Sequence, residues 1–362
     1  MLRFDSDYMA GAHQEILDAL VRTNRELTAG YGNDPYTAEA KALIRKACDA
    51  PEAEVMFLVG GTQTNATAID GILAHHEGVL AAESGHIAVH ESGAIEASGH
   101  KVLTLPHTFG KVSKEDVAKY IEEFYADETY QHMVAPGMLY ISQPTEYGTL
   151  YTLNELEGLS EVCHRHNIPL YIDGARMGYA LAAEGADFTL RDIARLADVF
   201  YIGGTKLGTL FGEALVVTNR ALLKNLFPLV KQHGALLAKG RLSGVQFEAM
   251  FSDGLYYEIG RHAVALALRI REAFRAKGYE VEERRISIEE VYNAAENGTL
   301  NEMFGTGTAA VISPVGELNW DGKKVVINNN EIGEVSQKLY DRLTGIQWGR
   351  QADPHGWIYK II

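Results

Sequence analysis

The chain has 362 residues, of which 46% are hydrophobic, so it is long enough to bury a large core and to form two or three domains. Its net charge of −15 repels nucleic-acid phosphates, and no cluster of Lys and Arg on a predicted helix offsets that repulsion. No apolar stretch approaches the roughly 18 residues of a membrane span, and the two cysteines lack the spacing of a zinc site or a disulfide framework. We therefore expect a cytoplasmic globular protein with no metal, no membrane partner and no nucleic-acid partner.

Helix and strand patterns alternate from about residue 11 to about residue 239. Apolar residues at helical spacing predict helices over residues 13–25 and 38–47. Short apolar runs predict strands at 55–59, 79–81, 101–103, 138–141, 170–172, 199–202 and 214–217. Helical segments separate many of these runs, which is typical of a mostly parallel sheet covered on both faces. A long helix over 255–276 follows and ends before Gly278.

Two of the predicted strands end in charged groups. Asp173 closes the run Tyr171-Ile172-Asp173, and Lys206 follows the run that ends at Gly203-Gly204-Thr205. Because the carboxyl ends of parallel strands meet at one edge of a sheet, we expect Asp173 and Lys206 to share one crevice. A lysine there can form a Schiff base with pyridoxal phosphate (PLP), and an aspartate can keep the pyridine nitrogen protonated. The pair therefore predicts a PLP enzyme, and the glycines around Lys206 are expected to leave room for the cofactor.

A glycine turn lies upstream of this pair. The segment from Val59 to Asn65 follows a predicted strand and opens a helix that runs to about His75. Glycines let a backbone approach a ligand, and the free amides of a helix start attract phosphate. We expect this segment to form a phosphate cup.

A histidine-rich segment follows at residues 85–93. It brings together His86, His90 and Glu91, but it lacks the HExxH order and a matching third metal ligand. An imidazole can instead stack on a pyridine ring, and His or Glu can act as acid or base beside it. This segment is therefore a candidate source of the catalytic base.

These motifs together resemble the threonine aldolase family over roughly residues 1–280. The matching residues occur in the family's order: Ser6-Asp7, Gly32-Asn33-Asp34-Pro35, Gly61-Thr62-Gln63-Thr64-Asn65, His86 with Glu91, Asp173-Gly174-Ala175-Arg176 and Thr205-Lys206. The resemblance implies the α/β fold of PLP-dependent transferases of type I, that of aspartate aminotransferase. It also implies PLP-dependent cleavage of β-hydroxy amino acids by a homodimer or homotetramer.

The resemblance also implies roles for individual residues. Its cofactor-binding positions are Gly61, Thr62, His86, Asp173, Arg176, Thr205 and Lys206. Among these, Lys206 bears the cofactor, Asp173 pairs with the pyridinium and His86 stacks on the ring. Ser6 and Arg176 meet the substrate carboxylate. Glu146 stands where many members have a histidine, so the candidate bases, in order, are His86, His90 and Glu146.

The tail resembles a different family. From about Ile286, and above all in Gly305-Thr306-Gly307-Thr308-Ala309, the sequence is similar to the end of branched-chain aminotransferases, PLP enzymes of another fold. Nothing upstream matches that family's lysine-bearing body. Thr306 and Thr308 therefore lack their usual partners, and we expect only a glycine-rich loop between strands. No arginine in the tail matches the second carboxylate-binding arginine of threonine aldolases.

These patterns lead to one expected organisation and three hypotheses. We expect a PLP-binding large domain over 1–250, a connecting helix over 251–280 and a smaller, atypical C-terminal α+β segment over 281–362, joined near residues 280–286 as in a chimera. The first hypothesis is an aldehyde-lyase that cleaves L-threonine or a related β-hydroxy amino acid to glycine and an aldehyde, impaired by its tail. The alternatives are a branched-chain amino acid aminotransferase and a PLP-binding protein with little activity.

Overall fold

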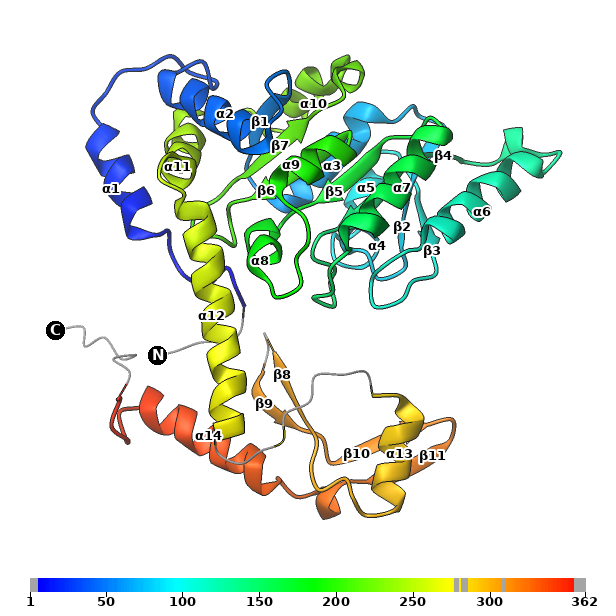
Figure 1. The fold of residues 1–362 in the computed structure, drawn as a ribbon, viewed down its shortest axis with the longest axis vertical. Coiled ribbons are helices and arrows are strands. Elements are labelled where there is room, and N and C mark those ends of the chain that lie inside the picture. Colours follow the sequence, from blue (N-terminus) through cyan, green and yellow to red (C-terminus); the bar gives the residue numbers. More distant parts are fainter. Residues whose placement is uncertain (1–5, 277–279, 281–285, 308–309, 355–362) are drawn as a thin grey trace. The chain divides into compact units, whose positions relative to one another are not determined.

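The structure is a computed structural model that describes residues 6–276, 280, 286–307 and 310–354 (Figure 1). It divides into two compact units, which we describe separately. The larger unit is Gly11–Ala273, and the smaller one combines Met1–Ala10 with Phe274–Ile362. The predicted junction at 280–286 lies mostly outside the described residues.

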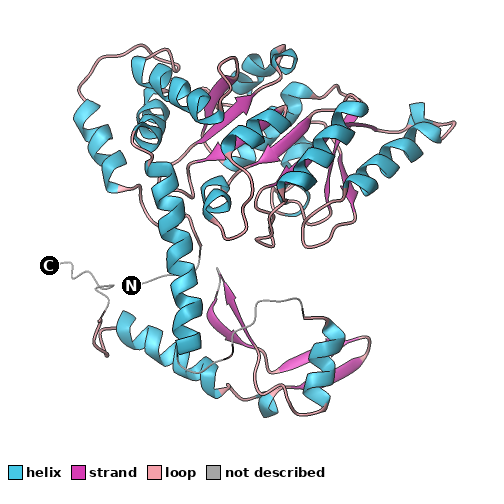
Figure 2. Ribbon diagram, viewed as in Figure 1, coloured by secondary structure: helices cyan, strands magenta, loops and turns pink. Residues whose placement is uncertain are grey.

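The larger unit is built from one sheet and the helices around it (Figure 2). Its strands are β1 (Glu54–Leu58), β2 (Glu77–Ala82), β3 (Val102–Leu105), β4 (Ala135–Ser142), β5 (Leu170–Asp173), β6 (Val199–Gly203) and β7 (Glu213–Val217). Its helices are α1 (Gln14–Thr23), α2 (Pro35–Cys48), α3 (Gly61–Ile72), α4 (His86–Val89), α5 (Ala94–Ala97), α6 (Lys114–Ala126), α7 (Leu153–Arg165), α8 (Met177–Ala182), α9 (Leu190–Leu196), α10 (Leu226–Gln232) and α11 (Arg241–Ser252). The long helix α12 (Leu255–Ala276) has the predicted bounds.

The strand order in the sheet is β1-β7-β6-β5-β4-β2-β3. The pairs β2/β3, β2/β4, β4/β5 and β5/β6 are parallel, whereas β7 is antiparallel to both β1 and β6. The sheet is therefore mostly parallel, as predicted. The carboxyl ends of β1, β2, β4, β5 and β6 meet at one edge, together with the amino end of β7.

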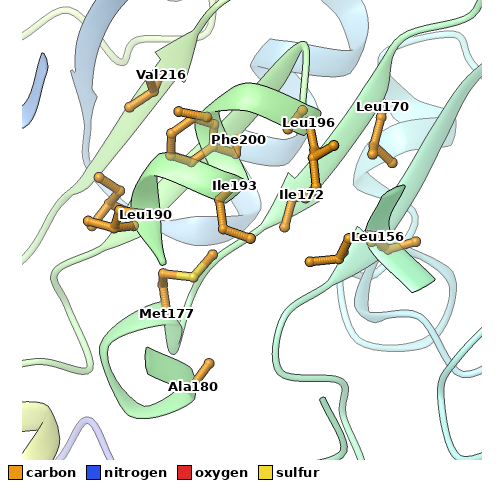
Figure 3. Packing of buried hydrophobic residues seen from close by; sticks show 14 of the residues in the cluster. Leu156, Leu170, Ile172, Met177, Ala180, Leu190, Ile193, Leu196, Phe200 and Val216 are labelled. Atoms are coloured by element: carbon orange, nitrogen blue, oxygen red, sulfur yellow. The ribbon is translucent and has the colours of Figure 1, made fainter. Parts of the chain in front are cut away.

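Buried apolar side chains cover both faces of this sheet. On one face, Ile172, Phe200 and Val216 belong to a core that includes residues of α7, α8 and α9 (Figure 3). On the other face, Tyr140, Tyr171 and Tyr201 pack in a second core with residues of α3 and α10. Successive strand residues alternate between the two cores because a strand has a period of two.

Helix starts follow from local sequence. Asp34 caps α2 by accepting a hydrogen bond from the Thr37 N–H at 2.9 Å, and Pro35 occupies the first helical position. Asp34 is 1% exposed, so the Asn33-Asp34-Pro35 motif serves here as a buried helix start. Thr152 and Glu155 form a reciprocal capping box at α7.

The smaller unit contains α13 (Ile288–Glu296), β8 (Phe304–Gly307), β9 (Ala310–Pro314), β10 (Glu317–Trp320), β11 (Lys323–Val326) and α14 (Glu334–Gln347). Each of the two strand pairs, β8/β9 and β10/β11, is antiparallel. The Glu302 carboxylate accepts hydrogen bonds from the Val335 and Ser336 N–H groups and so caps α14. Gly305, Thr306 and Gly307 of the Gly-Thr-Gly-Thr-Ala segment lie in β8, so the expectation of a loop is wrong for these three residues. Thr308 and Ala309 are outside the described residues.

Candidate active site

The candidate site lies at the edge where the parallel strands end. Asp173 is the last residue of β5, and Ser142 at the end of β4 is its partner in register. Lys206 lies three residues beyond β6, α3 begins three residues beyond β1, and His86 begins α4 after β2. The strand order therefore gathers the predicted residues of the larger unit, although they are far apart in sequence.

Asp173 is a buried carboxylate that is 4% exposed. Its Oδ2 atom accepts hydrogen bonds from the Tyr140 hydroxyl at 2.6 Å and the Asn65 amide at 3.1 Å, and its Oδ1 accepts the Ala175 N–H at 3.0 Å. Burial raises the pKa of Tyr140 well above its ordinary value, so this hydroxyl stays protonated and donates. All three donors are neutral. Within the described residues, Asp173 forms no ion pair, so a cationic ligand is the group that its charge suits.

Asn65 joins Asp173 to a second buried carboxylate. Its Nδ2 donates to Asp173 and also to Glu91 Oε1, at 2.8 Å, while its Oδ1 accepts the Tyr171 hydroxyl at 2.8 Å. Asn65 is 1% exposed and lies in the first turns of α3. Asn65 appeared in the sequence motif without a role, and the only signal was its place four residues after Gly61.

His86 forms a pair with Glu91. The His86 Nδ1 lies 2.8 Å from Glu91 Oε1, and the Glu91 side chain has no exposed surface, whereas His86 is 36% exposed. The hydrogen bond to Glu91 raises the pKa of His86 above its ordinary value. Because Nδ1 is held by Glu91, Nε2 is the atom available to exchange a proton.

The other two candidate bases lie close to His86. Glu146 is exposed, but its Oε1 accepts the His86 backbone N–H at 2.9 Å and the Ser142 hydroxyl at 2.6 Å. Glu146 therefore holds the start of α4 in place. The His90 ring is exposed, and its centroid lies 5.7 Å from that of His86.

The loop that carries Lys206 is closed by short-range hydrogen bonds. The Gly204 N–H donates to the Gly212 carbonyl at 3.1 Å, and the Gly212 N–H donates to the Thr205 hydroxyl oxygen at 3.1 Å. The Tyr179 hydroxyl donates to the Lys206 carbonyl. Lys206 itself is half-buried.

The glycines of this loop lie where the backbone packs closely or takes a left-handed conformation. A Cβ at Gly203 would lie 2.2 Å from the Ala175 carbonyl oxygen, and one at Gly204 would lie 2.7 Å from the Gly212 carbonyl oxygen. Gly208 has a φ of +97°. Close backbone packing and a left-handed turn therefore require these glycines, and the expectation that they clear space for a ligand stays a prediction.

The backbone of this loop also donates a hydrogen bond to a carboxyl group that was not predicted from the sequence. Glu213, the first residue of β7, is 4% exposed, and its Oε2 accepts the Gly204 N–H at 3.0 Å. Burial raises the pKa of Glu213 to about 7. The predicted strand began one residue later, at Ala214, so the glutamate was left outside it.

The start of α3 has no side-chain cap. Gly60 precedes the helix in an extended conformation, and a Cβ there would meet nothing within 4 Å. A Cβ at Gly61 would lie 3.2 Å from the Tyr201 hydroxyl oxygen, and Thr62 is exposed. Uncapped amides at a helix start suit an anion such as phosphate.

The remaining predicted residues divide between the two units. Arg176 is half-buried at the start of α8, three residues after Asp173. Ser6 belongs to the smaller unit, where its hydroxyl lies 3.5 Å from the Tyr8 nitrogen. Among the described residues, no group of three His, Cys, Asp or Glu side chains is arranged to hold a metal ion, and no helix is long and apolar enough to cross a membrane.

The residues of the larger unit fit PLP on three observations. An amine and a buried carboxylate without a cationic partner lie on neighbouring strand ends, and an uncapped helix start lies at the same edge. Together they can hold an aldehyde, a protonated pyridine and a phosphate. The fold and this site define a PLP-dependent enzyme of the type I transferase fold.

Comparison with known proteins identifies the family. The family described as β-eliminating lyase matches residues 3–299. A low specificity L-threonine aldolase of Pseudomonas sp. is 30% identical over 263 residues, which are 72% of this chain and 75% of that relative. The solved structure of Leishmania major threonine aldolase is 38% identical, has a TM-score of 0.75, and covers 94% of this chain and 98% of that one. The chain belongs to the β-eliminating lyase family, in which its relatives are threonine aldolases, and it is a PLP-dependent carbon–carbon lyase.

The tail has its own relatives. Over 84 residues it is 62% identical to a probable branched-chain-amino-acid aminotransferase of Staphylococcus epidermidis. That match covers 23% of this chain and only 24% of that relative. It therefore concerns about a quarter of that protein.

Proposed function

We propose that this protein is an aldehyde-lyase that cleaves L-threonine or a related β-hydroxy amino acid to glycine and an aldehyde. The Pseudomonas relative and the Leishmania structure, both named as threonine aldolases, support the substrate class. The observation that carries the proposal is the His86–Glu91 pair, linked through Asn65 to the buried Asp173. It provides a proton acceptor beside the carboxylate that suits a pyridinium.

The cofactor would be held by groups from three strand ends. PLP, when bound, supplies an aldehyde for the substrate amine and a ring that accepts the electrons of the broken Cα–Cβ bond. Lys206 offers the amine for covalent attachment, and Asp173 keeps the ring nitrogen protonated. Gly61 and Thr62 present the amides of the α3 start to the phosphate.

His86 would take the proton that cleavage requires. The proton moves from the substrate β-hydroxyl to His86 Nε2, while the proton on His86 Nδ1 stays there and donates its hydrogen bond to Glu91. The negative charge of Glu91 stabilises the resulting imidazolium, which agrees with the raised pKa of His86. Glu146 and His90 are the next candidates, but Glu146 already accepts two hydrogen bonds at one oxygen.

The substrate carboxylate would be met by Arg176 and Ser6. We propose that the tail supplies no further arginine to this carboxylate and that cleavage is therefore weak. The two described arginines of the tail make local contacts: Arg342 donates to Gln351 at 2.6 Å, and Arg350 lies 4.4 Å from the Trp348 ring centre. The similarity of the tail to an aminotransferase favours, as the second candidate, transamination of branched-chain amino acids.

A single set of assays separates these functions. Purified protein is loaded with PLP, its absorbance spectrum is recorded, and threonine is added while glycine and aldehyde are measured. Borohydride reduction followed by peptide mapping should place the cofactor on Lys206. Glutamate formed from leucine and 2-oxoglutarate would instead indicate the aminotransferase, and a spectrum without either product would indicate a PLP-binding protein with little activity.

We propose that the protein assembles with itself as a homodimer or homotetramer. Several large apolar side chains of the larger unit are exposed, among them Val21, Leu27 and Phe227 at 77%, 102% and 56%. The resemblance to threonine aldolases, whose members usually act as homodimers or homotetramers, implies the same assembly here. Light scattering during size-exclusion chromatography tests the proposal, and a monomer at all concentrations would reject it.

A further inference from the structure

Asn65 is a buried amide to which the proposed chemistry assigns no step. It is 1% exposed and lies four residues after Gly61, the first residue of α3. Residues four apart lie on the same face of a helix, so Asn65 lies one turn further along the face that begins at Gly61. A buried amide needs partners for its donors and for its acceptor, because an unsatisfied polar group in the interior is costly.

Asn65 is hydrogen-bonded to three buried side chains. Its Nδ2 donates to Asp173 Oδ2 at 3.1 Å and to Glu91 Oε1 at 2.8 Å, while its Oδ1 accepts the Tyr171 hydroxyl at 2.8 Å. Burial raises the pKa of Tyr171 well above its ordinary value, so this hydroxyl stays protonated and donates. A flipped amide would turn its oxygen towards two carboxylates, which offer only acceptors. The partners of Asn65 therefore fix one orientation of the amide.

The two carboxylates depend on Asn65 to different degrees. Asp173 keeps two other donors, a hydroxyl and a backbone N–H. The Glu91 side chain has no exposed surface, and its Oε2 has no hydrogen-bond partner among the described residues. In the part of the chain that the structure describes, only Asn65 and His86 form hydrogen bonds with the Glu91 side chain. Loss of the Asn65 amide would therefore affect Glu91 more than Asp173.

The position of Glu91 decides where the ring proton of His86 lies. Glu91 Oε1 is 2.8 Å from His86 Nδ1 and 2.8 Å from Asn65 Nδ2. A carboxylate oxygen held in this place accepts a hydrogen bond from Nδ1–H, and the lone pair of Nε2 is then free to accept a proton. Without Asn65, Glu91 would have one partner instead of two. The Nδ1–H group would then have no fixed acceptor, and both neutral tautomers of the ring would be accessible.

We propose that Asn65 is a positioning residue for His86: through Glu91 it keeps the imidazole proton on Nδ1, so that Nε2 stays free to accept the proton of the substrate β-hydroxyl. This role rests on the proposed function, in which His86 is the base. It concerns the base more than the cofactor, because Asp173 has other donors. A buried amide with a purely structural role would change stability and leave the tautomer of His86 as it is.

The test measures the tautomer of His86 in the full-length protein without added cofactor, since every hydrogen bond in the argument joins residues of the chain itself. The protein is produced with isotope-labelled histidine, and the His86 signals are those missing from His86→Gln. At about pH 9, well above the ordinary histidine pKa, the ring-nitrogen chemical shifts give the ratio of the Nδ1–H to the Nε2–H tautomer. Titration with PLP gives the cofactor affinity of the same samples.

In Asn65→Leu we expect this ratio to fall about tenfold, the effect of losing a hydrogen bond to a charged group. Leucine has nearly the shape of asparagine but donates no hydrogen bond, and it leaves no space for a water molecule to replace the amide. PLP affinity should fall by a smaller factor, because Asp173 keeps two of its three donors.

Two further variants make the result specific. Thr67→Val is the matched control: Thr67 is a fully buried residue of α3 whose hydroxyl has no hydrogen-bond partner among the described residues. Its substitution removes no hydrogen bond and should leave the ratio unchanged. Tyr171→Phe keeps the amide of Asn65 but removes the hydroxyl that fixes its orientation. It should lower the ratio by a smaller factor, and it serves if Asn65→Leu does not fold.

An unchanged tautomer ratio in Asn65→Leu would overturn the inference, and if that variant does not fold, an unchanged ratio in Tyr171→Phe overturns it. An equal change in Thr67→Val would also reject it, because the effect would then follow from any substitution in the core of α3. The proposed function is judged separately, by glycine release from threonine. A ratio that depends on Asn65 in a protein without threonine cleavage would leave this inference intact and reject the function.

Discussion

At the scale of single residues, substitution of Asp173 should lower catalytic turnover more than it lowers the affinity for PLP. Asp173→Asn keeps the side-chain shape but cannot neutralise a pyridinium. We expect turnover of threonine to fall about 10- to 100-fold, the effect of losing a charge-assisted hydrogen bond, with a smaller change in PLP affinity. Steady-state kinetics and PLP titration measure the two effects. Asp18→Asn, an exposed change on α1, is the control, and wild-type turnover in Asp173→Asn would remove Asp173 from its proposed role.

The His86–Glu91 pair predicts a pH dependence. A hydrogen bond to Glu91 raises the pKa of His86, so His86 becomes a neutral base only at a higher pH than an ordinary histidine. In Glu91→Gln the hydrogen bond to a carboxylate is removed, so we expect the pKa of His86 to fall. The acid limb of the kcat/KM profile should therefore move to lower pH. An acid limb that stays in place would show that His86 is not the group whose ionisation limits the reaction.

Glu213 predicts how stability changes with pH. Its pKa in the folded protein is about 7, against an ordinary value of 4.5, so folding favours the protonated form. Its stabilising contribution is complete below pH 4.5 and is lost as the pH rises through 7. Relative to Glu213→Gln, the unaltered protein should lose about 2 to 3 kcal/mol of unfolding free energy between about pH 5 and pH 8. Urea unfolding without cofactor measures this, and a constant difference between the proteins would contradict it.

At the scale of elements, the start of α3 is the feature to test. In Gly61→Ala the added methyl group lies 3.2 Å from the Tyr201 hydroxyl and among the amides proposed to hold phosphate. We expect PLP affinity to fall about tenfold, whereas stability without cofactor should change by no more than about 1 kcal/mol, the helix-propensity difference between Gly and Ala. PLP titration and thermal melting distinguish these outcomes. Unchanged PLP affinity would exclude Gly61 from the phosphate site.

Comparison of the observed strands with the predicted ones shows which features of the fold follow from the sequence alone. Apolar runs predicted strands close to β1, β5 and β6, because buried parallel strands are continuously apolar. They could not predict that β7 would lie between β1 and β6, since strand order depends on packing between distant segments. The roles of Asn65 and Glu213 were missed for the same reason: each depends on partners that only the folded sheet brings near.

At the scale of the whole molecule, the chain resembles threonine aldolases over most of its length and branched-chain aminotransferases over its tail. The larger unit, Gly11–Ala273, lies within the range that matches the β-eliminating lyase family, and the tail resembles an aminotransferase. Asp173, Lys206 and His86 all lie in the larger unit, so the proposed cofactor site needs no side chain from the tail. The proposed effect of the tail concerns the substrate carboxylate instead. Cofactor binding and substrate cleavage should therefore depend differently on the tail.

Replacing the tail tests that separation. We propose that the tail provides no arginine for the substrate carboxylate, and a missing charge-assisted pair costs on the order of 1.5 to 3 kcal/mol, or about one to two decades in kcat/KM. Exchanging residues from about 281 onward for the C-terminal domain of a threonine aldolase should raise threonine cleavage by about that factor while PLP affinity stays the same. The unaltered protein should show no transamination of leucine, because its matches to branched-chain aminotransferases cover only about a quarter to a third of those relatives. Full turnover by the unaltered chain, with no gain on exchange, would show instead that this tail completes a working substrate site.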